Sequence, residues 1–129
     1  MQKQKISKNI ASALAYLKEA ADPKGKENEK MISMQIWRAS SNLEYALFLF
    51  SIIQPQGNTY SSWKPTSKEQ QTIEILLPTA IEELKEATNY FKNGNIREAY
   101  KITWKAKNQL LQIQDLFDKK RKENLKNSG

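Results

Sequence analysis

Apolar residues recur at alternating steps of three and four along four segments of the chain. That spacing places them on one face of an α-helix. The predicted helices span about residues 5–21, 27–53, 67–93 and 96–125. The pattern therefore predicts an all-α protein. The expected core positions of the second and fourth helices are Ile36, Ala39, Leu43, Ala46 and Phe50, and Thr103, Ala106, Leu110, Ile113 and Phe117.

Helix-breaking residues separate these segments. Residues 22–25 (Asp-Pro-Lys-Gly) are expected to end the first helix, because the residue before a proline avoids helical geometry. Residues 66–69 (Thr-Ser-Lys-Glu) fit a capping box for the third helix. Residues 93–95 (Asn-Gly-Asn) predict its end, with Gly94 in the left-handed conformation. Pro78, inside the third segment, is expected to kink or split that helix.

Two parts of the chain align with each other without a gap. Residues 12–50 match residues 79–117 at 11 of 39 positions, among them Trp37 and Trp104. Common origin and convergent helix packing both remain open as explanations. Either way, two similar hairpins predict an antiparallel four-helix bundle. The expected single domain, residues 1–129, consists of hairpin one (about 5–53), a connecting loop (54–66) and hairpin two (about 67–125).

The second hairpin carries small and aromatic residues at the spacing that allows close helix packing. They are Ala87, Tyr90, Gly94, Ala99 and Ala106. Over about 35 residues this hairpin resembles a tetratricopeptide-type helical hairpin, which implies shared hairpin packing. The chain as a whole resembles the small helical-bundle proteins of unknown function found in archaeal genomes.

Composition argues against most enzymatic chemistry. The chain has no cysteine and no histidine, which removes the usual thiolate nucleophile, the commonest general base and the commonest metal ligands. With four glycines, no glycine-rich phosphate loop can be drawn. Glu82, Glu83 and Glu86 cluster on the third helix, but Glu82 and Glu86 are expected to form a solvated face paired with lysines. We therefore expect no enzyme, no cofactor and no metal site.

Hydropathy and the N-terminal residues bear on location. The longest apolar-rich run, residues 45–53, is far shorter than the roughly 20 residues of a membrane-spanning helix. No apolar segment typical of a secretory signal follows the first residues. A cytoplasmic protein without membrane association is expected.

The second predicted helix carries more apolar surface than one core face needs. Residues 45–50 are apolar at every position, and Trp37, Tyr45, Phe48 and Ile52 form a second stripe. A helix that is apolar all round is buried on all sides. Its cover is expected to be either the loop containing Tyr60 and Trp63 or a second copy of the protein. These six residues are the candidate interface of a non-enzymatic interaction or scaffolding module, which is expected to form a homodimer or to bind another protein.

The net charge of +7 supports an alternative function. Arg97, Lys101 and Lys105 form a basic stripe that leads towards residues 119–122. Such charge suits the phosphate backbone of a nucleic acid and needs no base reading. An ordinary solvated helix face explains the stripe equally well. The candidate phosphate-binding residues are Arg97, Lys101, Lys105, Lys119, Lys120, Arg121 and Lys122.

Overall fold

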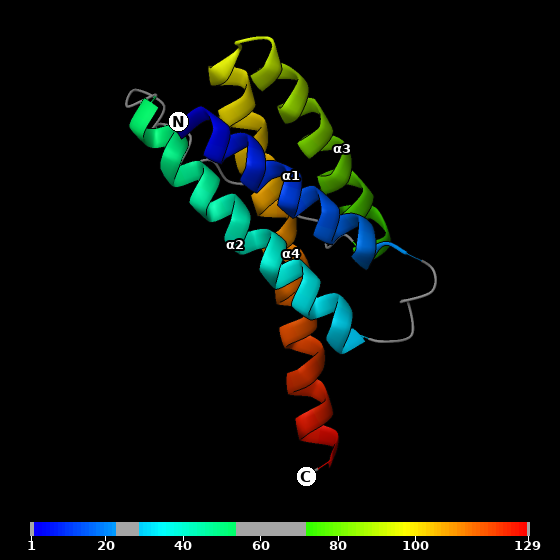
Figure 1. Ribbon diagram of the computed structural model, residues 1–129. Helices are drawn as coiled ribbons and strands as arrows, with labels where there is room; N and C mark the ends of the chain where they lie inside the picture. The colour runs from blue at the N-terminus through cyan, green and yellow to red at the C-terminus, as the bar shows by residue number, and fades with distance from the viewer. Residues whose placement is uncertain (1, 23–28, 54–71, 129) are drawn as a thin grey trace.

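The computed structural model describes residues 2–22, 29–53 and 72–128. This part of the chain contains helices and no strand, so the prediction of an all-α protein is confirmed. The helices are α1 (Gln2–Ala20), α2 (Glu29–Ile53), α3 (Ile73–Lys92) and α4 (Ile96–Ser128), drawn in chain order from blue to red in Figure 1.

The helix ends differ from the predicted ones mainly at the start of α3. This helix begins at Ile73 rather than near residue 67. Thr72 precedes it in an extended conformation, and its carbonyl accepts hydrogen bonds from the N–H groups of Ile75 and Leu76 at 3.1 and 2.9 Å. The predicted capping box at residues 66–69 lies outside the described residues.

Pro78 does not split α3. The helix continues through it to Lys92. Proline removes one backbone N–H from the helix interior, which frees the carbonyl four residues earlier. One position further on, the hydroxyl of Thr79 donates to the carbonyl of Ile75 at 2.7 Å. The alternative that proline divides this segment is therefore wrong.

The turn between α3 and α4 has the predicted left-handed glycine. Gly94 has a φ of 80°. Its N–H donates to Phe91 at 3.1 Å, and the N–H of Asn95 donates to Tyr90 at 2.8 Å. This pair of bonds is the Schellman motif, which satisfies the last carbonyls of a helix. It turns the chain sharply enough for α4 to begin at Ile96.

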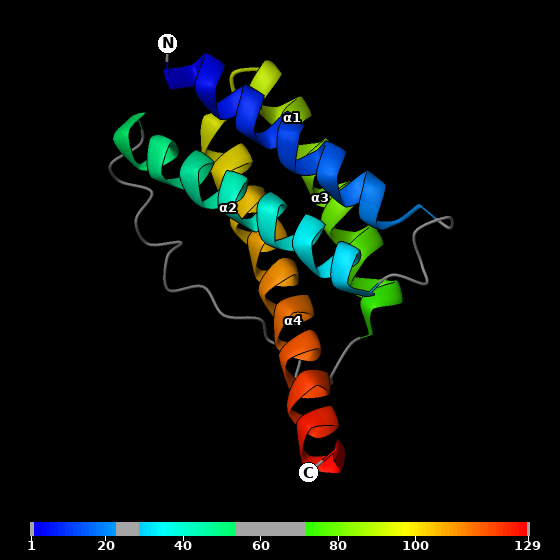
Figure 2. The ribbon, with the colours of Figure 1, turned by 60° about the horizontal axis from the view of Figure 1, so that its bottom comes forward.

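The helices associate in pairs. Helix α1 lies along α2, and α3 lies along α4; α2 also contacts α4, and α1 contacts α3. Partners within a pair run in opposite directions in both ribbon views (Figures 1 and 2). Helix α4, the longest at 33 residues, projects beyond the other three at its C-terminal end (Figure 2). Its residues 118–123 are all exposed.

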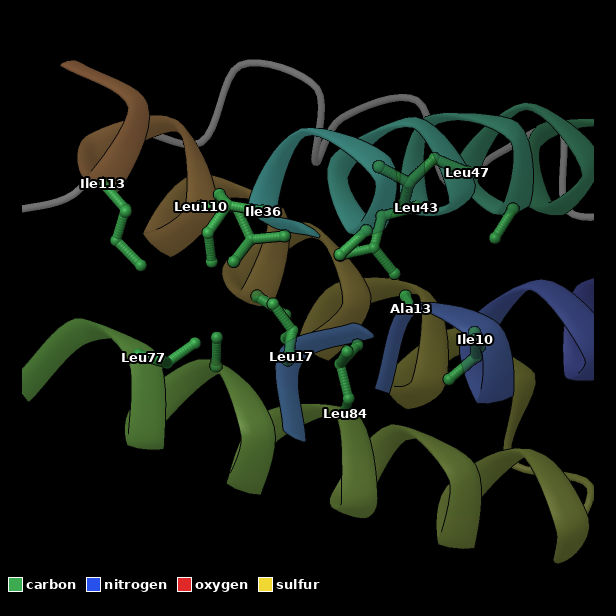
Figure 3. Packing of buried hydrophobic residues seen from close by; sticks show 14 of the residues in the cluster. Ile10, Ala13, Leu17, Ile36, Leu43, Leu47, Leu77, Leu84, Leu110 and Ile113 are labelled. Atoms are coloured by element: carbon green, nitrogen blue, oxygen red, sulfur yellow. The ribbon is translucent and has the colours of Figure 1, made fainter. Parts of the chain in front are cut away.

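The core lies between the four helices. Side chains from every helix point into it in Figure 3, including Leu17 of α1, Leu43 of α2, Leu84 of α3 and Leu110 of α4. All four are fully buried. The five core positions expected on each of α2 and α4 are likewise buried.

Burial follows the internal repeat closely. Many of the equivalent residues of the two segments, 67 positions apart, are buried in both. The contact pattern agrees, because exchanging α1 with α3 and α2 with α4 leaves the set of contacting helix pairs unchanged. The buried pairs include Ala13 and Ala80, Leu17 and Leu84, Ala39 and Ala106, Leu43 and Leu110, and Phe50 and Phe117.

Candidate interaction surface on helix α2

Helix α2 has two apolar sides, and only one of them packs inside the molecule. Its inner side includes Ile36, Leu43 and Phe50, all fully buried. On the opposite side, six large apolar residues are each between 45% and 63% exposed. Together with Ser41 they recur every three or four residues along the helix, and we name them the outer face of α2. Its members are Met31, Met34, Trp37, Ser41, Tyr45, Phe48 and Ile52.

The structure places four of the six predicted interface residues on this face. Trp37, Tyr45, Phe48 and Ile52 are all exposed. Tyr60 and Trp63 lie outside the described residues. Sequence reasoning missed the two methionines, although their three-residue spacing from Trp37 continues the same stripe towards the start of α2.

Polar contacts hold both edges of the outer face. Towards α1, the guanidinium of Arg38 lies over the ring of Tyr16, 5.9 Å from its centroid. The amide of Gln35 donates to the carboxylate of Glu19 at 2.8 Å. Towards α4, Glu44 pairs with Lys107 at 3.7 Å. An apolar centre with a polar rim is the arrangement found in protein interfaces.

The equivalent positions on α4 are almost entirely polar. Moving 67 residues along the chain replaces the methionines, Tyr45, Phe48 and Ile52 by charged or amide residues. The same hairpin architecture thus carries an exposed apolar stripe in one copy and a mostly half-buried polar stripe in the other. The α4 positions are Glu98, Lys101, Trp104, Asn108, Gln112, Asp115 and Lys119.

Trp104 is the one large apolar residue among these seven α4 positions, and it is half-buried. It packs against the core, and the ammonium of Lys107 lies 4.8 Å from its ring centroid. The ring nitrogen is buried without a hydrogen-bond partner among the described residues. Its equivalent, Trp37, is 63% exposed. The two tryptophans therefore share a place in the repeat but not an environment.

Glu83, a member of the acidic cluster noted in the sequence, has an environment that the sequence did not predict. It is half-buried between α3 and α4, and burial raises the pKa of its carboxyl group above the ordinary 4.5. A hydrogen bond with Gln109 and the positive charge of Lys105 act in the opposite direction. One carboxylate oxygen has no hydrogen-bond partner among the described residues. Nearby Glu82 is exposed and pairs with Lys85 at 3.3 Å, as expected of a solvated face.

The basic residues of the alternative function are spread along the length of α4. Arg97 lies near the start of α4 and Lys122 near its end, about 37 Å apart at 1.5 Å per residue. Between them, Lys101 and Lys105 are half-buried. At the projecting end, Lys120 pairs with Glu29 and Arg121 pairs with Asp118. Lys119 and Lys122 are exposed there.

Hollows in the described part of the molecule gather around Glu29, where α2 begins, and Phe117 of α4. One of about 390 Å³ is lined mainly by apolar side chains, among them Ile32, Leu77 and Phe117. In the described ranges, no three acidic side chains are placed to hold a metal ion.

Comparisons with known proteins add no relative. No family model matches the chain, and neither a curated protein nor a solved structure matches it. The resemblances to tetratricopeptide hairpins and to archaeal helical bundles therefore stay predictions. Over the residues that the structure describes, none of the helices combines the length and the apolar character needed to cross a membrane.

Proposed function

We propose that this protein is a non-enzymatic interaction or scaffolding module that self-associates through the outer face of α2. The observation that carries the proposal is the continuous apolar stripe from Met31 to Ile52, half-exposed along its length. Large contiguous apolar patches on a soluble domain mark interaction sites. Aromatic residues such as Trp37 and Tyr45 supply much of the binding energy in such interfaces.

The scaffold we infer is one antiparallel four-helix bundle of two similar hairpins, spanning residues 1–129 as a single domain. The pairing of α1 with α2 and of α3 with α4 supports it. So does the matching burial of equivalent residues. In such a bundle each helix keeps one side outward, and α2 alone makes that side apolar. We place the protein in the cytoplasm.

The size of the outer face suits a dimer. Large aromatic side chains have 150–250 Å² of surface each, so the three half-exposed aromatic residues of this face leave on the order of 300 Å² available. The half-exposed Met31, Met34 and Ile52 add to this area. A stable interface buries about 800 Å² on each partner. The apolar stripe thus supplies a substantial part of the area that one partner must contribute, and the polar rim around Arg38 and Glu44 supplies more.

Light scattering after gel filtration tests this function. The wild type is expected to have a mass close to twice the 14.9 kDa of one chain. Phe48→Glu places a charge in the middle of the stripe and should lower the mass towards that of a monomer. Ile75→Glu is the matched control, because Ile75 is 53% exposed and belongs to α3, outside the outer face of α2. A wild type that is monomeric at all concentrations contradicts the proposal.

A second candidate is phosphate-backbone binding at the projecting end of α4. The exposed Lys119 and Lys122 support it. The neighbouring ion pairs of Lys120 and Arg121 reduce the free charge available there. We rank it second for this reason.

A further inference from the structure

We propose that the two copies dock with their α2 helices antiparallel, related by a twofold axis that passes close to Ser41. This inference rests on the proposed self-association and specifies its geometry. It follows from the order of side-chain sizes along the outer face of α2.

The outer face is nearly symmetric about its middle. Ser41 lies at the centre of the stripe that runs from residue 31 to residue 52. Aromatic residues lie four positions away on either side, at Trp37 and Tyr45. Seven positions away on either side lie Met34 and Phe48. Reversing the direction of the helix therefore leaves the pattern of large and small residues almost unchanged.

That symmetry gives each large residue an apolar neighbour in an antiparallel pair. Trp37 of one copy lies level with Tyr45 of the second, and Met34 lies level with Phe48. The ends of the stripe, Met31 and Ile52, meet in the same way. A twofold interface requires such self-complementarity, because the same patch must serve both copies.

Ser41 provides the point of closest approach. It is the only small residue within the outer face, and it is exposed. Helices pack when the ridges of side chains on one fit the grooves of the other. A dip between Trp37 and Tyr45 on both copies lets the two ridges cross there, with the aromatic rings on either side of the crossing.

Opposed helix dipoles favour the antiparallel direction over the parallel one. Arg38 and Glu44 do not decide the direction, because they lie on opposite edges of the outer face and contact Tyr16 and Lys107 within their own copy.

The outer face of α2 fits the same face of a second copy better than it fits the equivalent side of α4. The equivalent side of α4 carries Glu98, Asp115 and Lys119 in place of apolar residues. Docking α2 of one copy on α4 of another would bury those charges without partners, at a cost of several kcal/mol for each ion. Pairing of α2 with α2 buries apolar surface on both copies. Because each copy uses the same face, the assembly is a closed dimer.

Disulfide formation between single-cysteine variants tests the geometry, and the cysteine-free chain provides a clean background. Ser41→Cys should form a covalent dimer under mild oxidation, since the axis places the two thiols together. Met31→Cys and Ile52→Cys should each fail alone, because in either homodimer the two thiols are about 30 Å apart along the helix. An equimolar mixture of these two variants should form the covalent heterodimer. Asp115→Cys, the α4 equivalent of position 48, controls for random collision.

The outcomes separate the geometry from the proposed function. If Met31→Cys and Ile52→Cys each cross-link to themselves, the helices are parallel; the inference fails and self-association through α2 stands. If light scattering shows a dimer but no α2 variant cross-links above the Asp115→Cys control, the dimer uses another surface. Both the antiparallel docking and the proposed self-association through α2 are then wrong. A monomeric protein in which Trp37 is shielded from fluorescence quenchers indicates that the chain itself covers the face, which overturns both.

Discussion

The ring of Phe50 on α2 stacks on the ring of Tyr100 on α4, with centroids 5.2 Å apart and 19° between their planes. Phe91 of α3 meets the same phenylalanine edge-on at 5.7 Å. One side chain thereby joins three helices, including both members of the second hairpin. Two residues earlier on α2, Phe48 points outwards and is 60% exposed.

This contrast predicts opposite effects of two identical substitutions. Phe50→Ala removes a fully buried ring and should lower the free energy of unfolding by about 3–5 kcal/mol. Phe48→Ala should change the stability of the monomer by less than about 0.5 kcal/mol while weakening self-association. Urea unfolding at concentrations where the protein is monomeric measures the stability of both variants, and light scattering measures the self-association of Phe48→Ala. Equal destabilisation by the two variants would show that Phe48 is also part of the core.

Gly94 should respond to substitution through its backbone alone. Its φ of 80° is unfavourable for a side chain, while an added Cβ would meet nothing within 4 Å. Gly94→Ala should therefore cost about 1–2 kcal/mol of stability. Gly94→Asn should cost less, because asparagine tolerates this conformation. Thermal unfolding of both variants tests this ranking. If Gly94→Asn were the more destabilising of the two, steric crowding at the turn would be the cause.

The environment of Glu83 predicts a pH-dependent gain in stability when its charge is removed. Burial raises the pKa of the folded state above the ordinary 4.5, so the folded protein binds this proton more tightly than the unfolded chain does. The resulting penalty is fully present above both pKa values and disappears below them. Glu83→Gln should therefore raise the melting temperature at pH 7 and match the wild type near pH 4.

Glu82→Gln is the control for that experiment. Glu82 is exposed and pairs with Lys85, and isolated surface pairs contribute at most about 1 kcal/mol. Its substitution should change the melting temperature little at either pH. A Glu83→Gln variant that melts below the wild type at pH 7 would show that the attraction of Lys105 outweighs the effect of burial.

Gel retardation distinguishes the two candidate functions. At about 50 mM salt, the protein should cause no retardation of duplex DNA or of single-stranded RNA. Binding that weakens steeply with salt and is reduced by Lys119→Ala together with Lys122→Ala would support the phosphate-binding alternative. Phe48→Glu should leave such binding unchanged, so the two functions can be assigned to different surfaces.

Most of the fold could be predicted from the helical pattern, because the packing face of a helix and the residues of a turn are local properties of the sequence. The spacing of Leu43 and Leu110 predicted that both lie in the core, and residues 93–95 predicted the turn between α3 and α4. The start of α3 was harder to predict. Nearby polar residues can cap a helix at several positions, and only tertiary packing selects Thr72.

The candidate site likewise has features that the sequence predicted and features that it did not. Exposure of Trp37 and Phe48 followed from an apolar stripe opposite the core stripe on one helix. The half-burial of Lys105 did not, because it depends on how closely α3 approaches α4 around Glu83. Sequence periodicity locates a face on its own helix but cannot say which neighbouring helix covers it.

The projecting end of α4 divides the molecule into parts of unequal stability. Residues 118–123 lie beyond the packed core, so their helical state depends on local hydrogen bonds and on the pairs Lys120–Glu29 and Arg121–Asp118. Short helical segments without tertiary packing are marginal in water. On heating, far-ultraviolet circular dichroism should therefore decline gradually before the main transition, while the near-ultraviolet signal of Tyr100 and Trp104 stays level. Amide hydrogen exchange would be fast at this end and slow around Leu110.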